Sequence, residues 1–174
     1  SYWESLRSVK RGDTVIHLRG EGRAAAFVGY STAEAEGHET TSTPPRAGQW
    51  AYAKSFYRVG LSGYVPFTDP IALKAVFATR DHELRKYFNE NRARPQLAKE
   101  RLFYVAQAGR LQCLNGAYLS ELSPELAGII FGPAFSGSSV SDATGIVSAR
   151  TGEQVARIKA RLGQAEFSDH VRAN

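Results

Sequence analysis

The chain is poor in the residues that crosslink proteins, bind metals or cross membranes. Of its 174 residues, one is cysteine and four are histidine. A lone thiol, Cys113, cannot form a disulfide within the chain, and the histidines (His17, His38, His82 and His170) lack the spacing of metal ligands. No apolar run approaches the roughly 18 residues of a membrane span, and the first ten residues lack the apolar centre of a signal peptide. We therefore expect a cytoplasmic protein with no metal, no cofactor and no membrane contact.

Signatures of the common enzyme classes are missing as well. The sequence contains no G-x-S-x-G elbow, no phosphate-cradling glycine motif, no H-E-x-x-H and no C-x-x-C. The glycines at 20 and 22 suit a hairpin turn instead. We therefore expect no catalytic residue in this chain and a function in binding.

Charge is the first positive feature. Lysine and arginine outnumber aspartate and glutamate by 22 to 17, which gives a net charge of +5. Residues 85–110 hold seven cations against two carboxylates, so this stretch alone accounts for the whole excess. The cations are Arg85, Lys86, Arg92, Arg94, Lys99, Arg101 and Arg110. Such a stretch is either a solvated helix and loop or a surface that binds the phosphates of a nucleic acid.

The periodicity predicts strands at both ends of the first 130 residues. Alternation after a Gly-Asp turn predicts a strand over 14–18, and apolar runs predict strands over 24–30 and 50–61, on either side of a long polar loop. Two further strands are expected to join at Ala108-Gly109. These strands precede and follow a helical region, so the expected order along the chain is strands, then helices, then strands.

Three helices are expected between and after these strands. One is predicted within 67–77, with Asp69 as its N-cap and Pro70 in its first position, and another over 81–93. A short third helix follows Ser123 as N-cap. Because strands and helices do not alternate as βαβ units, we expect an α+β fold, a small curved barrel that is mostly antiparallel, with flanking helices.

The composition changes from Gly132 onward. Glycine, serine, alanine and threonine dominate as far as residue 152, which is typical of a linker. After it, Val155, Ile158 and Leu162 have the spacing of one helix face. We therefore expect a domain over 1–132, followed over 133–174 by a linker and a helical segment.

Aromatic residues gather near the expected ends of the first strands. Two tryptophans that flank strand ends suit a slot that stacks on a planar ligand, although core packing is the alternative for each of them. The candidates are Trp3, Tyr30, Trp50, Tyr52 and Phe56.

Polar groups interrupt a later apolar stretch, LQCLNGAYLSEL. Gln112, Asn115 and Tyr118 supply amide and hydroxyl groups there. Asn115 and the following glycine are either a turn or bulge, or part of a site in which an amide reads the hydrogen-bonding edge of a nucleobase.

Several segments together resemble a known family. YWESL, VKRGDTVIHL, AAFVGYSTA, GQWAYAKSFYRVGL and LNGAYLSELSPELAGIIF are similar to the EVE branch of the PUA superfamily, which is related to YTH and SRA readers. The resemblance spans about residues 2–132. It implies a small curved barrel with an aromatic pocket for one modified base, in which Trp3 and Trp50 are walls and Tyr30-Ser31 is the corner between them.

The last residues carry a second resemblance. ARIKARLGQAEFSDHVRAN is similar to the segment that leads into the HNH nuclease of bacterial modification-dependent restriction enzymes. It implies that Phe167 and Val171 pack against a nuclease outside this chain, and that any divalent metal belongs to that nuclease.

Together with the basic stretch, these two resemblances imply a specificity domain that binds double-stranded DNA carrying 5-methylcytosine or 5-hydroxymethylcytosine. The base would be flipped into the aromatic slot, while the basic stretch holds phosphates. Three alternatives stay open: a phosphorothioate reader using Pro45, Arg46 and Tyr64, a YTH-type reader of modified RNA, and an interaction module without a nucleic-acid role. A homodimer formed through the longer protein also stays open.

Overall fold

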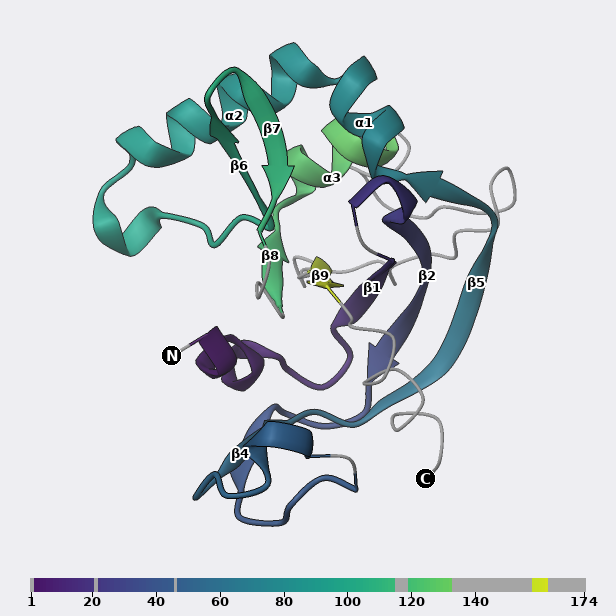
Figure 1. The fold of residues 1–174 in the computed structure, drawn as a ribbon, viewed down its shortest axis with the longest axis vertical. Helices are drawn as coiled ribbons and strands as arrows, with labels where there is room; N and C mark the ends of the chain where they lie inside the picture. Colours follow the sequence, from purple (N-terminus) through teal and green to yellow (C-terminus); the bar gives the residue numbers. More distant parts are fainter. Residues whose placement is uncertain (1, 21, 46, 115–118, 133–157, 163–174) are drawn as a thin grey trace.

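The structure is a computed structural model that describes residues 2–20, 22–45, 47–114, 119–132 and 158–162. Its largest sheet has five strands in the order β5-β2-β1-β9-β8 (Figure 1). The bounds, in the same order, are Leu61–Ala72, Ala26–Ala33, Thr14–Arg19, Ile158–Leu162 and Ser120–Leu122. Strands β1 and β2, β2 and β5, and β8 and β9 pair antiparallel, whereas β1 and β9 pair parallel.

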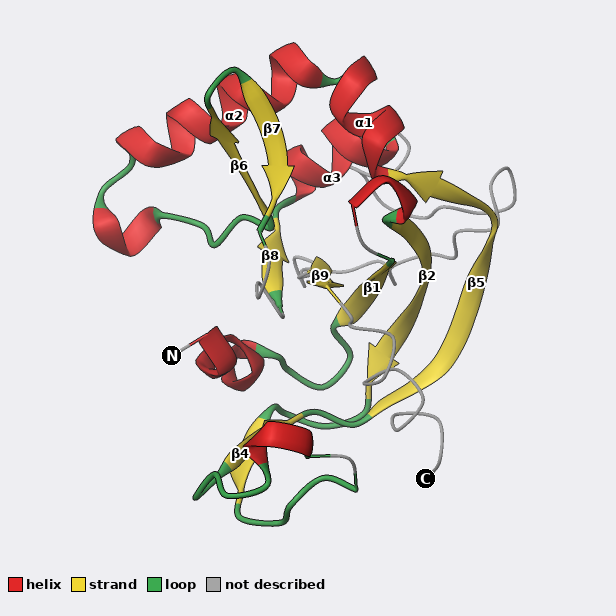
Figure 2. Ribbon diagram, in the orientation of Figure 1, coloured by secondary structure: helices red, strands yellow, loops and turns green. Residues whose placement is uncertain are grey.

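Two antiparallel hairpins and three α-helices complete the fold. The hairpins are β3 with β4 (His38–Thr40, Phe56–Arg58) and β6 with β7 (Tyr104–Gln107, Arg110–Cys113). The α-helices are α1, α2 and α3 (Leu73–Thr79, Asp81–Ala93, Pro124–Phe131), and the 3-10 helices are η1, η2, η3 and η4 (Tyr2–Ser8, Gly22–Ala24, Gly48–Trp50, Gln96–Ala98). The α-helices gather at one end of the molecule, and β4 lies at the opposite end (Figure 2).

The α+β class and the mostly antiparallel pairing are confirmed. The described strands form one open sheet and two hairpins, and their pairings do not close into a barrel. The register shifts once between β1 and β2 and twice between β2 and β5. Such irregularities bend strands and increase their twist, which accounts for the curvature of β2 and β5 in Figure 1.

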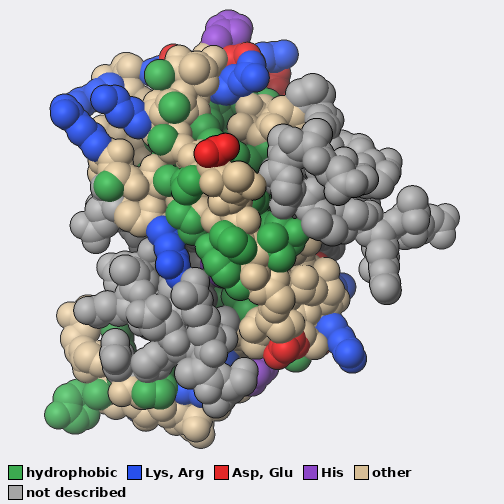
Figure 3. Space-filling view, turned by 90° about the vertical axis from the view of Figure 1, so that its right-hand side faces the viewer, with side chains coloured by type: hydrophobic (Ala, Val, Ile, Leu, Met, Phe, Trp, Pro, Cys, Tyr) green, Lys and Arg blue, Asp and Glu red, His purple; other side chains and the backbone are tan. Residues whose placement is uncertain are grey.

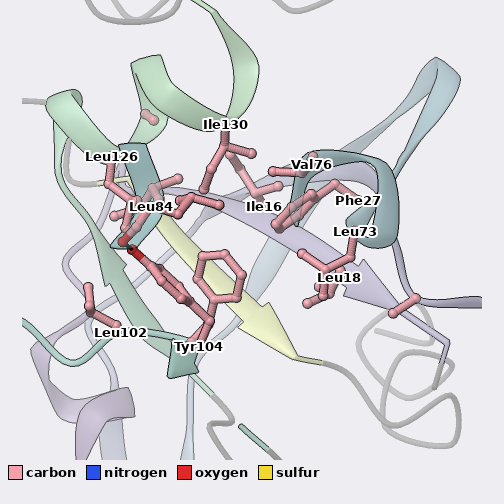
Figure 4. Packing of buried hydrophobic residues seen from close by; sticks show 14 of the residues in the cluster. Ile16, Leu18, Phe27, Leu73, Val76, Leu84, Leu102, Tyr104, Leu126 and Ile130 are labelled. Carbon is pink, nitrogen blue, oxygen red and sulfur yellow. Dashed lines mark hydrogen bonds between the residues drawn. The ribbon is translucent and has the colours of Figure 1, made fainter. Parts of the chain in front are cut away.

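The main core lies between the sheet and the helices. Aliphatic and aromatic side chains of β1 and β2 meet those of all three α-helices, and Leu102 and Tyr104 close one side (Figure 4). The labelled members of this cluster are Ile16, Leu18, Phe27, Leu73, Val76, Leu84, Leu102, Tyr104, Leu126 and Ile130. A second, smaller cluster joins η1 to the other end of the sheet through Leu6, Val9 and Val15.

Several local predictions are confirmed. Helix α2 spans the predicted residues 81–93, and the turn between β6 and β7 falls at Ala108-Gly109, where both residues have positive φ. The Ser123 hydroxyl caps α3 by accepting a hydrogen bond from the Leu126 amide at 3.2 Å. The turn and the cap of α3 depend on residues that act on their own neighbours, so sequence alone suffices for them.

The predicted Asp69 cap is wrong. Asp69 and Pro70 lie inside β5, and α1 begins at Leu73. Pairing with β2 continues as far as Ala72, so strand pairing overrides the local capping signal. Pro66 and Pro70 are both tolerated in β5 because it is the last strand of the described sheet, where one row of backbone groups has no ladder partner.

Two strand and helix assignments also need correction. The strand predicted over 50–61 is interrupted, because residues 48–50 form η3 and only Phe56–Arg58 pair, as β4. The helix predicted from Val155, Ile158 and Leu162 is wrong over Ile158–Leu162, which is strand β9. The letters IKARL alternate apolar and basic residues, the period of a strand, and pairing on both sides with β1 and β8 selects that reading. Residues 133–157 and 163–174 lie outside the described residues.

Candidate functional site

The aromatic candidates at the β3–β4 end are accessible. Trp50 is 49% exposed in η3, and Tyr52, two residues later, is 97% exposed. Phe56 is half-buried at the start of β4. These three residues come from one short segment, and two of them present large apolar surface to solvent.

Tyr30 and Ser31 lie in the interior instead. The prediction that Tyr30 ends a strand is wrong, because β2 runs on to Ala33. Tyr30 is buried, and the centre of its ring lies 6.2 Å from the centre of the Phe67 ring. The Ser31 hydroxyl is 2.8 Å from Nε2 of His17. Their partners in the sheet explain their burial.

The described candidates for a base pocket are therefore spread over the molecule. Gln112 is exposed on β7, which lies far from β4 in Figure 1. Trp3 belongs to η1, but its side chain lies outside what the structure describes, as do Asn115 and Tyr118 altogether. The structure does not bring the described candidates into one cavity.

On helix α2, two predicted phosphate-binding residues are engaged within the protein. Nε of Arg85 donates to both carboxylate oxygens of Asp81, at 2.6 and 2.8 Å, and its Nη2 donates to the Gly109 carbonyl at 2.7 Å. The hydrogen bond from Arg85 lowers the pKa of Asp81. Nζ of Lys86 lies 3.7 Å from Oε1 of Glu90, one turn later in the helix. Arg85 in particular is held against the β6–β7 turn rather than offered to a ligand.

Glu100 is fixed by contacts to both its backbone and its side chain. The side-chain amide of Asn91 donates to the Glu100 carbonyl and accepts from its N–H, both at 2.9 Å. Nη1 of Arg94 lies 2.7 Å from one carboxylate oxygen, and the Tyr87 hydroxyl donates to the other at 2.5 Å. The guanidinium of Arg94 also lies over the Tyr87 ring. Helix α2 thereby holds the segment that follows η4 in one position.

This anchoring leaves the neighbours of Glu100 turned outward. Lys99 and Arg101 are both exposed and make no ion pair within the described part of the chain. Arg92 and Arg110 are likewise exposed and without an ion pair among the described residues, although Arg92 lies 5.8 Å from the centre of the Phe88 ring. Four of the seven predicted phosphate-binding residues are thus available to a ligand.

Lys99 and Arg101 also line a cleft of about 280 Å³. Its other walls come from η1 and from β8, which face this segment on the left of Figure 1. The lining residues are Ser5, Ser8, Lys99, Arg101, Leu119, Ser120 and Glu121. The sequence indicated only the two cations, because the serines become neighbours of the basic segment only when the chain folds. On the β5 side, Lys and Arg side chains are instead dispersed around exposed hydrophobic ones (Figure 3).

Tyr87 gives this region a measurable pH response. Burial, followed by the hydrogen bond to Glu100, raises the pKa of Tyr87 from 10.0 to about 12. Its contribution to stability is therefore complete below pH 10 and is lost as the pH rises from about 10 to about 12, because the unfolded chain releases the proton first. We expect the free energy of unfolding to fall by about 2–3 kcal/mol across this window from this group alone.

The measurement is urea unfolding at pH 9 and pH 11.5, with Tyr87→Phe as the comparison. Burial also raises the pKa of Tyr104, so some alkaline loss occurs in both proteins. The variant should lose less stability between the two pH values than the wild type. Equal losses would show that Tyr87 does not titrate as its surroundings require.

Other chemistry finds little support in the described residues. Burial raises the pKa of the Cys113 thiol to about 11, which makes it a poor nucleophile at neutral pH. Across the described segments, no three His, Cys, Asp or Glu side chains meet as metal ligands would. A helix with the length and apolarity to cross a bilayer does not occur in the same segments.

Comparison with known proteins adds no identity. No family model matches the chain, and neither curated proteins nor solved structures give a significant match.

Proposed function

We propose that the chain is a DNA-binding specificity domain that recognises a modified cytosine by base flipping and directs an HNH endonuclease to it. The observation that carries the proposal is that the basic stretch, residues 85–110, keeps exposed cations without ion pairs among the described residues. Four exposed cations, Arg92, Lys99, Arg101 and Arg110, have no ion-pair partner among the described residues. Lysines and arginines left in this state are the groups that phosphates attract.

The exposed aromatics supply the second half of the proposal. Trp50 and Tyr52 offer large ring surfaces to solvent at one end of the molecule. Stacking on an extruded base would offset part of the few kcal/mol needed to unstack it. A methyl group adds only about 1 kcal/mol on burial, so discrimination between cytosine and 5-methylcytosine should be modest. 5-Hydroxymethylcytosine would need a dedicated hydrogen-bond partner.

The proposal includes the finer parts of the resemblance. These are a PUA-type barrel over 1–132, a chain without catalytic residues, and a cytoplasmic protein that acts on double-stranded DNA. The curved sheet with its irregular β2 pairings supports the barrel, and β9 would extend that domain's sheet beyond residue 132.

The test measures binding of one duplex at two salt concentrations by fluorescence anisotropy. Wild type should bind with a steep salt dependence, since each phosphate contact contributes about 0.9 to the slope of log affinity against log salt. Arg110→Gln should flatten that slope by roughly one contact. Asp69→Asn, which changes the net charge by one unit in the opposite direction at an exposed residue of β5, should steepen the slope or leave it unchanged.

A phosphorothioate duplex and a single-stranded RNA with methyladenosine complete the set. Preference for either would replace the modified-cytosine proposal by the corresponding reader. Salt-independent binding, or none to any nucleic acid, would contradict a nucleic-acid function.

A further inference from the structure

The cleft beside Lys99 and Arg101 is assembled from three distant parts of the chain. Ser5 and Ser8 come from η1, the two cations from the segment after η4, and Leu119, Ser120 and Glu121 from β8 and the residue before it. Two cations and three hydroxyl-bearing residues therefore meet around a space of about 280 Å³. Cations and hydroxyls are the groups that surround a phosphate in proteins.

Ser120 is the member whose bonding the protein leaves incomplete. Its side chain is 1% exposed, and its hydroxyl has no hydrogen-bond partner within the part of the chain that the structure describes. The Ser8 hydroxyl differs, because it donates to the Ser5 carbonyl at 2.7 Å. Buried hydroxyls are normally paired, so a buried hydroxyl without a partner, in a residue that lines the cleft, indicates a missing acceptor.

The backbone between the two cations is held in place before any ligand arrives. Glu100, which lies between them in sequence, is bonded through its backbone to Asn91 and through its carboxylate to Arg94 and Tyr87. Binding at Lys99 and Arg101 therefore costs less ordering of the backbone than binding at two residues of a free loop.

One carboxylate borders the same cleft. Glu121 is exposed, whereas its neighbour Ser120 is buried. Successive side chains of a strand point to opposite faces, so the carboxylate of Glu121 and the hydroxyl of Ser120 leave β8 on opposite faces. The charge lining the cleft remains positive, with two cations against one carboxylate.

We propose that this cleft binds the phosphate group of a single nucleotide, with the phosphate between Lys99 and Arg101 and the Ser120 hydroxyl donating to one of its oxygens. The cleft volume lies at the lower limit of ligand pockets, which begin at roughly 300 Å³, so it suits one phosphorylated unit. The inference rests on the proposed function in that the nucleotide belongs to a nucleic acid. A free mononucleotide presents the same group.

The experiment titrates the full chain with deoxycytidine monophosphate, inorganic phosphate and deoxycytidine, using calorimetry. The monophosphate should bind, inorganic phosphate should compete with it, and deoxycytidine should not bind. Lys99→Gln and Arg101→Gln should each weaken binding of the monophosphate roughly tenfold, because each removes a charge-assisted hydrogen bond. Ser120→Ala should weaken it less, and Glu121→Gln should leave it equal or stronger.

Lys74→Gln is the matched control, because it removes one exposed cation of α1 that does not line the cleft. It should leave monophosphate binding unchanged. An equal loss in Lys74→Gln, or equal binding of monophosphate and deoxycytidine, would overturn the proposal. If Ser120→Ala does not fold, the two cation variants still decide it.

The same proteins distinguish this inference from the proposed function. Salt-dependent duplex binding by a chain that binds no monophosphate would overturn the cleft and leave the DNA-binding proposal in place. Binding of the monophosphate without binding of any duplex would sustain the cleft and contradict the specificity domain.

Discussion

Replacing Asn91 with alanine should lower the free energy of unfolding by about 2–4 kcal/mol, because it leaves two polar backbone groups of Glu100 without their partner. The Asn91 side chain is 6% exposed, and its amide bonds both the N–H and the carbonyl of Glu100. Water can replace these bonds only if the segment after η4 moves away from α2. The same substitution should therefore also weaken the binding of any ligand that depends on Lys99 and Arg101.

Asn89→Ala is the matched control, since Asn89 is exposed on the same helix. Chemical denaturation measures the free energy of unfolding of both variants. The loss in Asn91→Ala should exceed the loss in Asn89→Ala by at least about 1.5 kcal/mol. Equal and small effects in the two variants would mean that the segment after η4 does not depend on Asn91.

Replacing Ala160 with proline should cost about 3 kcal/mol or more, because proline removes a backbone donor inside a sheet. Ala160 pairs with Ile16 of β1 on one side and with Ser120 of β8 on the other. The loss should appear as a lower midpoint of thermal unfolding and as a tendency to aggregate, since the paired edges of β1 and β8 become available to other chains.

Ala160→Val separates the backbone effect from the side-chain change, because valine keeps the N–H and favours strands. A chain shortened to residues 1–132 removes β9 altogether and should be at least as unstable as Ala160→Pro. A fully stable 1–132 fragment would show that β9 is dispensable for the sheet.

Features set by neighbouring residues could be predicted from the sequence. The cap of α3 at Ser123, the Ala108-Gly109 turn and the extent of α2 depend on contacts within a few residues. Features set by pairing could not. Asp69 and Pro70 form a good helix start locally, yet the strand continues past them because Ile71 and Ala72 pair with β2. The segment after residue 157 has both helical and alternating patterns, and only its two strand partners decide between them.

The candidate site shows the same division. The sequence indicated the basic stretch but could not tell its paired cations from its available ones, because Arg85 and Arg94 find their partners through the fold. The resemblance also implied that Tyr30 and Ser31 form the corner of a base pocket, whereas both are buried within β2. Ser120 carried no signal of its own, since an unpaired hydroxyl is visible only in three dimensions.

The central claim is that the chain distinguishes a modified cytosine in duplex DNA. The most direct measurement compares the affinity for one duplex carrying cytosine, 5-methylcytosine or 5-hydroxymethylcytosine at a single position and a fixed salt concentration. We expect a modified duplex to bind more tightly than the plain one, with Trp50→Ala abolishing the preference while weak binding to all three persists. Equal affinity of the wild type for all three duplexes would contradict the claim.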